Sequence, residues 1–181
     1  DRMQLIEIGK TAEGRTQTMA IISSEANMRN LDRYKEIART LAQGQVSETT
    51  ARALANEGKA VVWIDFGLHS TEVAHGQTAP WMAYNAVSDE SEEMRNIRDN
   101  VIFLLVPNMN PDGTTLVANW YMQHVGTEFE HAPLPELYQK YVGHDNNRDW
   151  YMFNQPESRN VARQLYEEWF PQIIYNQHQT G

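Results

Sequence analysis

Three residues that could bind one metal ion follow two predicted strands. His69 and Glu72 come directly after the apolar run 60–66, so an imidazole and a carboxylate can point at one spot. His178 follows a later apolar stretch, 173–177. Two imidazoles and one carboxylate form the ligand set of a catalytic zinc site, whose fourth position is left for water. The nitrogen ligands favour zinc over calcium or magnesium.

Other interpretations of the same segments have to be weighed. A Glu near the start of a helix is stabilised by the helix dipole whether or not it binds a metal. His75 is a rival ligand, but positions six apart on a helix point about 120° away from each other. We therefore expect His75 not to share a metal with His69. The Gly9-Lys10-Thr11 segment is not a phosphate-binding loop, because Gln4 stands where that motif needs glycine.

A second polar cluster spans residues 145–149. Arg148 offers a guanidinium fork and Asn147 an amide, a combination suited to binding a carboxylate. A local ion pair between Arg148 and Asp149 is the simpler alternative. Asp145 has another possible task, which is to orient a metal-bound imidazole by accepting a hydrogen bond from its remaining N–H.

These side chains can meet only if a sheet brings the ends of their strands to one edge. Strands are expected at residues 3–8, 16–23, 60–66, 101–106 and 173–177, the last read as buried, and helices at 30–42, 47–56, 71–87, 88–98 and 156–169. Strands alternating with helices indicate an α/β fold, a three-layer sandwich with a mixed, mostly parallel central sheet. Ligands gather at the carboxyl ends of the strands in such sheets.

The segment between the fourth strand and residue 145 is expected to be irregular. Asn110-Pro111-Asp112-Gly113 predicts a turn in which Pro presets φ and Gly accepts a positive φ. Residues 114–144 are polar and aromatic with weak periodicity, which predicts a long functional loop. Trp120 and Tyr121 are the candidates in this loop for lining a substrate pocket.

Composition excludes several classes of protein. The chain has 181 residues, no cysteine and a formal net charge of −9, so a disulfide scaffold and a thiol nucleophile are excluded. The acidic surface makes nucleic acid and anionic lipid unfavourable partners. The longest apolar run is far shorter than the roughly 20 residues of a membrane-spanning helix. We expect one domain over residues 1–181, without nucleic-acid or membrane partners.

Taken together, the motifs resemble the M14 zinc carboxypeptidases of the carboxypeptidase A type. Residues 8–15 resemble the family's opening G-K-[ST]-x-E-G-R segment, 67–72 its G-x-H-x-x-E metal motif, 110–113 its N-P-D-G turn and 145–148 its D-x-N-R motif. His178 stands about a hundred residues after Glu72, where the family places its third ligand. Each motif is weak alone, but their order along the chain is specific.

The resemblance implies a function and a set of roles. One zinc ion per chain would bind His69, Glu72 and His178, with Asp145 behind His69. Asn147 and Arg148 would hold the C-terminal carboxylate of a peptide or protein substrate. The implied reaction is metal-assisted hydrolysis that releases C-terminal residues. Because many relatives are exported, a periplasmic or secreted location is expected.

Two departures from the family pattern limit what the resemblance implies. The family's general-base Glu and a Tyr lie well downstream of the third ligand, and this chain stops three residues after His178. We therefore expect residues 1–181 to be the N-terminal part of a truncated zinc-carboxypeptidase-like catalytic domain, inactive by itself. The sequence also has no Arg between Arg98 and Arg148 to steady an oxyanion, a position for which His124 or His131 are weak substitutes.

Two alternatives to a carboxypeptidase remain open at this stage. One is a related zinc amidohydrolase or deacylase with the same fold. The other is a non-catalytic peptide-binding module descended from such an enzyme. The presence of the downstream Glu and Tyr in a longer sequence would favour hydrolysis over binding.

Overall fold

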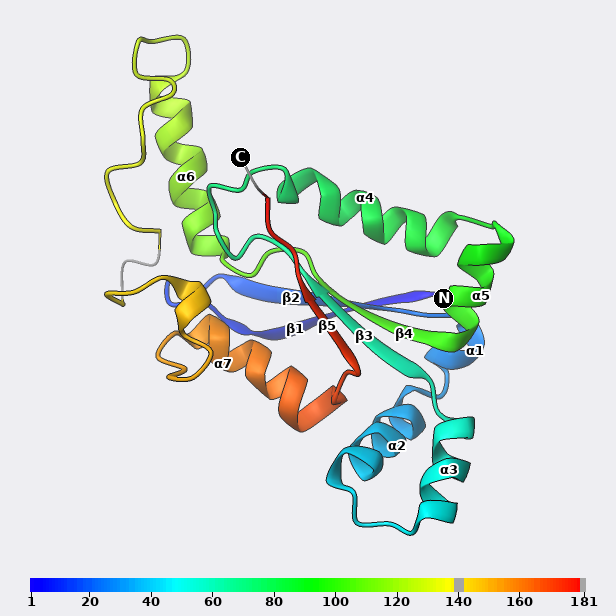
Figure 1. Cartoon of the computed structure of the whole chain (residues 1–181). Coiled ribbons are helices and arrows are strands. Elements are labelled where there is room, and N and C mark those ends of the chain that lie inside the picture. The colour runs from blue at the N-terminus through cyan, green and yellow to red at the C-terminus, as the bar shows by residue number, and fades with distance from the viewer. Residues whose placement is uncertain (139–141, 180–181) are drawn as a thin grey trace.

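The computed structural model describes residues 1–138 and 142–179, and its five strands form one mixed sheet (Figure 1). The strands are β1 (Met3–Lys10), β2 (Thr16–Ile22), β3 (Ala60–Asp65), β4 (Val101–Val106) and β5 (Ile173–Asn176). Their order across the sheet is β1-β2-β4-β3-β5. The pairings β1/β2 and β2/β4 are antiparallel, whereas β3 pairs in parallel with both β4 and β5. The carboxyl ends of β3, β4 and β5 therefore lie at one edge of the sheet.

Helices cover both faces of this sheet. They are α1 (Glu25–Met28), α2 (Leu31–Gln43), α3 (Glu48–Glu57), α4 (His75–Ser88), α5 (Glu92–Asn100), α6 (Pro111–His124) and α7 (Pro156–Arg163), with a 3₁₀ turn η1 (Asn146–Arg148) and a π-helical turn η2 (Gln164–Trp169). Figure 1 shows α4 on one side of the sheet, α2 and α7 on the other, and α6 projecting from the body. The expected α/β three-layer sandwich is confirmed.

The alternation of side chains along β3 and β4 builds one core on each face. Trp63 and Leu104, neighbours in the parallel register, are fully buried on the face covered by α7 and η2. Leu105 points to the opposite face, where it packs with Ala79 of α4. Burying each large apolar side chain stabilises the fold by about 1.5–3 kcal/mol. The sheet edge that carries the polar residues is therefore held by a core on each side.

Several elements differ from the sequence expectations. Helix α4 begins at His75, not at residue 71, because residues 69–74 form turns in which the Glu72 N–H donates to the His69 carbonyl. Helix α5 begins at Glu92, because the Ser91 hydroxyl caps it by accepting from the Met94 N–H. Strand β5 was expected to be buried. It is an outermost strand of the sheet and is exposed, with Ile174 49% exposed.

The largest difference concerns residues 111–124, which form helix α6 and not a turn followed by a loop. Asn110 is the N-cap, its side-chain oxygen accepting from the Gly113 N–H, and Pro111 takes the first helical turn, where its missing N–H is harmless. Gly113 is needed for space and not for a positive φ, since a Cβ there would lie 2.7 Å from Asn110 Nδ2 and 2.9 Å from Tyr138 Cβ. Residues 139–141 of the expected loop lie outside the described residues.

Within residues 1–138 and 142–179, no helix is long and apolar enough to cross a lipid bilayer.

Candidate metal centre

Parallel pairing of β3 and β5 brings together the three residues predicted to bind metal. Gly67 follows β3 with a φ of 72°, a left-handed conformation that favours glycine and turns the chain away from the strand. His69 and Glu72 lie in the turns that follow. Asp65 of β3 is paired with Asn176 of β5, so His178 emerges beside the same turns. Segments about a hundred residues apart in the sequence thus meet at one sheet edge.

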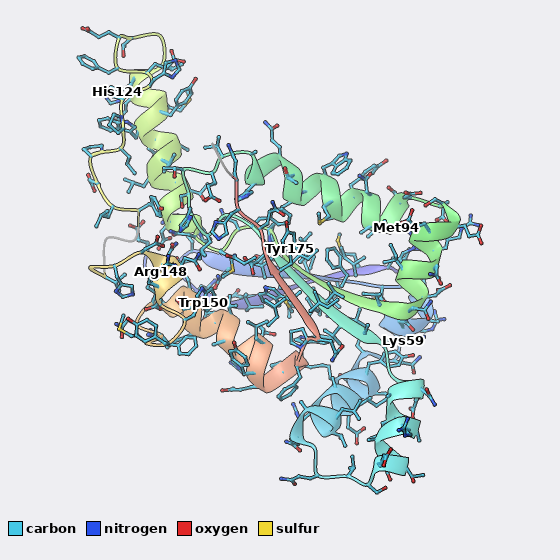
Figure 2. All side chains as sticks on the ribbon, in the orientation of Figure 1. Lys59, Met94, His124, Arg148, Trp150 and Tyr175 are labelled. Atoms are coloured by element: carbon cyan, nitrogen blue, oxygen red, sulfur yellow. The ribbon has the colours of Figure 1, made fainter. Side chains whose placement is uncertain are left out.

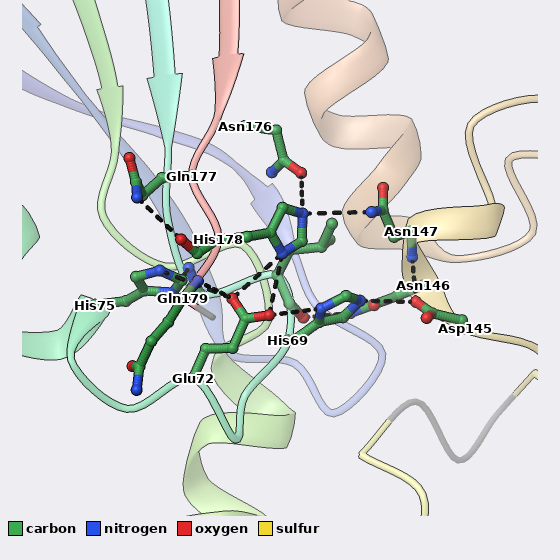
Figure 3. Close-up of polar contacts among 12 residues, drawn as sticks. His69, Glu72, His75, Asp145, Asn146, Asn147, Asn176, Gln177, His178 and Gln179 are labelled. Atoms are coloured by element: carbon green, nitrogen blue, oxygen red, sulfur yellow. Dashed lines mark hydrogen bonds and ion pairs between the residues drawn. The ribbon is translucent and has the colours of Figure 1, made fainter. Parts of the chain in front are cut away.

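The two imidazoles approach the same carboxylate with the same ring nitrogen. His69 Nδ1 lies 2.9 Å from Glu72 Oε1, and His178 Nδ1 lies 3.1 Å and 3.2 Å from the two Glu72 oxygens (Figure 3). One ligand atom from each residue falls within 4.8 Å of the other two. The arrangement could hold a single metal ion between two nitrogens and a carboxylate.

The opposite ring nitrogens have acceptors of their own. His69 Nε2 is 3.0 Å from Asp145 Oδ1, and His178 Nε2 is 2.6 Å from Asn176 Oδ1. A metal-binding histidine usually donates its second N–H to such an oxygen, which fixes the tautomer and the ring orientation. The donor set and its outer contacts therefore fit zinc, and Asp145 lies against His69, where the family resemblance implies it.

Electrostatics in the centre favour the charged forms of its residues. Burial lowers the pKa of His69, but the hydrogen bonds to Glu72 and Asp145 raise it by more, and the net shift is upward. Burial raises the pKa of Glu72, but the Gln179 N–H and the two histidines lower it by more. Glu72 is therefore ionised at neutral pH, and a proton on His69 would compete with any cation bound there.

Asp65 lies beneath the centre in a different environment. Asp65 is only 2% exposed. Burial raises the pKa of its carboxyl to about 6, although the hydrogen bonds from Trp63 and Asn176 act in the opposite direction and lower that pKa. Sequence reasoning passed over both Asp65 and Asn176. The available signal was their position, because Asn176 stands two residues before His178 at the end of a strand.

The predicted carboxylate-binding residues lie on the turn η1, beside the centre. Asp145 caps this turn, and Asn146 donates to the Leu68 carbonyl, which fastens the turn to the segment after β3. Arg148 is exposed (Figure 2). Its guanidinium donates to the Asn147 carbonyl at 3.0 Å. The Asn147 amide lies between Trp150 Nε1 at 3.1 Å and His178 Nε2 at 3.3 Å.

Asp149 is a structural residue and not the ion-pair partner considered for Arg148. It is 0% exposed, and its carboxylate accepts hydrogen bonds from His144, Ser158 and the N–H groups of Asn154 and Gln155. These bonds tie the segment after η1 to the start of α7. Burial raises the pKa of Asp149, but its donors lower it by more.

Two other histidines take positions outside the ligand group. His75 Nδ1 accepts from the Gly67 N–H at 3.0 Å, and its Nε2 is 3.8 Å from Glu72 Oε2. The group that could hold a metal ion consists of His69, Glu72 and His178, without His75. The helical-angle argument does not apply, because residues 69–74 are not helical. His124 packs on Trp120 at the far end of α6, away from the centre (Figure 2).

A cavity of about 620 Å³ opens beside Glu72, between the start of α4 and helix α6. Tyr121, the candidate for lining a substrate pocket, lines this cavity together with Val73, Pro80 and Val117. Trp120 instead donates its Nε1–H to the Ala132 carbonyl. The cavity offers a mainly apolar surface next to the candidate ligands.

A family model identifies the family of this chain, and solved structures share its fold. The family model described as zinc carboxypeptidase matches residues 1–173. Similar solved structures include a metallo-carboxypeptidase from Burkholderia cenocepacia (18% identity, TM-score 0.62), carboxypeptidase A from Helicoverpa armigera (15%, 0.62) and a metallo-carboxypeptidase from Pseudomonas aeruginosa in complex with (2-guanidinoethylmercapto)succinic acid (16%, 0.61). Each match covers 99% of this chain but only 37%, 41% and 36% of those structures, respectively. A search of curated protein sequences finds no match.

Proposed function

The chain belongs to the zinc carboxypeptidase family, and from this premise we propose that it is part of a zinc-dependent metallocarboxypeptidase that releases C-terminal residues from peptides. The observation that carries the proposal is the convergence of His69, Glu72 and His178 with their ligand atoms within 4.8 Å. Both histidines present Nδ1 to the centre while Nε2 faces an oxygen. One zinc ion per chain is the stoichiometry we propose.

The roles of the surrounding residues follow from their contacts. Zinc, when bound, would polarise the scissile carbonyl and lower the pKa of a bound water. Asp145 holds the Nε2 proton of His69 and keeps its Nδ1 lone pair directed at the centre. Arg148 is exposed and donates to a carbonyl of its own turn, and together with Asn147 it would grip the substrate carboxylate. We assign no general base among residues 1–138 and 142–179.

The extent of the chain bears on activity. It spans between 36% and 41% of the length of the three solved carboxypeptidases named above. We propose that residues 1–181 are one partial catalytic domain and that the remainder supplies the base, so this chain alone binds zinc without turnover. Location outside the cytoplasm stays a prediction from the family resemblance, which fractionation of the source cells would check.

Zinc content is the first test of the proposal. The purified chain should contain close to one equivalent of zinc by elemental analysis, and His178→Ala should lower that content sharply because a site with three protein ligands loses one of them. Arg98→Lys, at a buried position far from the centre, serves as a control for nonspecific loss. A wild-type chain without zinc, before and after reconstitution, would contradict the proposal.

Substrate specificity separates the alternatives. The longer parent protein should release residues from a peptide with a free C-terminus and not from the same peptide with a C-terminal amide. Equal cleavage of both, or activity only on acylated amino acids, would favour an amidohydrolase or deacylase. Peptide binding without hydrolysis by the parent would favour a binding module.

A further inference from the structure

A chain of hydrogen bonds runs from the buried sheet to the third candidate ligand. We propose that Asp65 is a positioning residue that determines which ring nitrogen of His178 is free to bind zinc. The inference rests on the proposed function, because it concerns the same metal centre. Asp65 is not itself a candidate metal ligand. It contacts Trp63 and Asn176, and Asn176 in turn contacts His178.

The contacts are direct at every step. Trp63 Nε1 donates to Asp65 Oδ2 at 2.6 Å, and Asn176 Nδ2 donates to Asp65 Oδ1. Asn176 Oδ1 then lies 2.6 Å from His178 Nε2, the contact drawn in Figure 3. Trp63 is 0% exposed and Asp65 2% exposed, so water does not compete for the hydrogen bonds of Asp65.

The chemistry of these groups fixes which partner donates and which accepts in each hydrogen bond. An indole N–H can only donate, and an ionised carboxylate can only accept. Asp65 therefore receives from both neighbours, and Asn176 must turn its NH₂ group toward it. The amide oxygen of Asn176 is then the atom that faces His178, so Nε2 carries the proton. The lone pair is left on Nδ1, which faces Glu72 and the centre.

A second amide makes the opposite demand on the same nitrogen. Trp150 Nε1 donates to Asn147 Oδ1, which turns the Asn147 NH₂ group toward His178 Nε2 at 3.3 Å. That contact would place the lone pair on Nε2 and the proton on Nδ1, where it would block a metal. The Asn176 contact is shorter at 2.6 Å. Asp65 decides between the two amides because it fixes the orientation of Asn176, and the Asn147 NH₂ group stays available for a substrate carboxylate.

A single isosteric substitution reverses the direction. In Asp65→Asn, the amide oxygen must accept from Trp63, so its NH₂ group faces Asn176. Asn176 then turns its oxygen to residue 65 and its NH₂ group to His178, and both amides favour a proton on Nδ1. We expect the zinc affinity of the chain to fall about 10–100-fold, the range for loss of an outer contact to a metal ligand. Competition with a chromophoric chelator measures this affinity.

A double variant separates direction from packing. Asp65→Asn combined with Asn176→Asp keeps one amide facing one carboxylate, and the carboxylate at position 176 again accepts from Nε2. Its affinity should return to within about threefold of wild type, well inside the loss expected for a missing contact. Long-range ¹H–¹⁵N spectra of the zinc-loaded double variant and wild type should both show the His178 proton on Nε2. Asp99→Asn, which removes the same charge from the exposed end of α5, should leave affinity unchanged.

Each outcome decides a different statement. Wild-type affinity in a folded Asp65→Asn chain refutes the inference alone. An equal loss of zinc affinity in the single variant and in the folded double variant refutes the inference too. The loss would then follow from altered packing and not from the reversed hydrogen bond between residues 65 and 176. If Asp65→Asn fails to fold, Asn176→Ala replaces it and must also bind zinc more weakly than wild type. A wild-type chain that takes up no zinc refutes the proposed function and the inference with it.

Discussion

The buried carboxylate of Asp149 should be one of the strongest single contributors to the stability of the segment that carries η1. Its Oδ1 accepts from His144 Nε2 at 2.9 Å and from the exposed Asn154 at 3.0 Å. Its Oδ2 accepts from the N–H of buried Gln155 at 3.0 Å and from the Ser158 hydroxyl at 2.5 Å. Asp149→Ala removes all four acceptor contacts at once.

The expected loss follows from which donors can find another partner. The Ser158 hydroxyl can rotate and Asn154 can reach water, but the Gln155 N–H stays buried, which costs about 1–3 kcal/mol. The lost charge-assisted hydrogen bonds add to this, and removing one partner of a buried charged network typically destabilises a protein by about 3–5 kcal/mol. We expect Asp149→Ala to lower the free energy of unfolding by about 3–4 kcal/mol. For a chain of this size that is a fall in Tm of roughly 10 °C.

Asp149→Asn should be much milder. Its amide oxygen can keep the buried Oδ2 position, and its NH₂ group can take the Oδ1 position, where His144 can switch tautomer to accept and Asn154 is solvated. We expect a loss of about 1–2 kcal/mol, close to that of a single hydrogen bond. Urea and thermal unfolding of the two variants measure the order, with Asp32→Asn on the exposed surface of α2 as the control.

The pH dependence has a definite sign. The pKa of Asp149 is lowered in the folded chain, so its contribution is present above the unfolded pKa and is lost as pH falls through the folded pKa. Asp149→Ala should lack that part of the acid dependence. A loss below 1 kcal/mol for Asp149→Ala, or an equal loss for Ala and Asn, would refute the reasoning about donors.

Three further predictions concern the centre and its support. Asp145→Ala should weaken zinc binding about 10–100-fold because His69 loses the acceptor of its Nε2–H, whereas Asp145→Asn, which keeps an oxygen, should lose less; chelator competition measures both. Zinc affinity should fall as pH decreases, because metal binding needs the neutral form of His69. The pKa of His69 is raised, so the fall should begin above the ordinary titration range of histidine. A pH series of the same competition checks this, and an affinity that does not change between about pH 6 and 8 would contradict it. Gly113→Ala should lower the free energy of unfolding by about 1–3 kcal/mol through overpacking against Asn110 and Tyr138, while Gly76→Ala, where no atom lies within 4 Å, should be neutral or slightly stabilising in thermal unfolding.

Local sequence signals were sufficient for most of the fold. Alternation and apolar runs predicted every strand within a few residues, and Ser47 was recognisable as the cap of α3. Helix α6 was missed although Asn110 and Pro111 form a regular helix start, because the same residues also suit a turn. The exposure of β5 could not be predicted, since its apolar sequence is the same whether or not another strand covers it.

Residue types and spacing named His69, Glu72 and His178 as candidate ligands. Each motif is weak alone, so the order of the motifs along the chain was needed to single these three residues out. The sequence could not supply the orientation of the histidine rings or of the hydrogen bonds behind them. The nitrogen that each ring turns to the centre depends on the acceptors behind it, and Asp65, Asn176 and Asn147 become neighbours only when β5 pairs with β3 and η1 folds against them. In our proposal the amino-acid sequence thus supplies the candidate donors, whereas the tertiary structure decides which ring nitrogen carries the proton, because a proton's position depends on contacts between segments far apart in the chain.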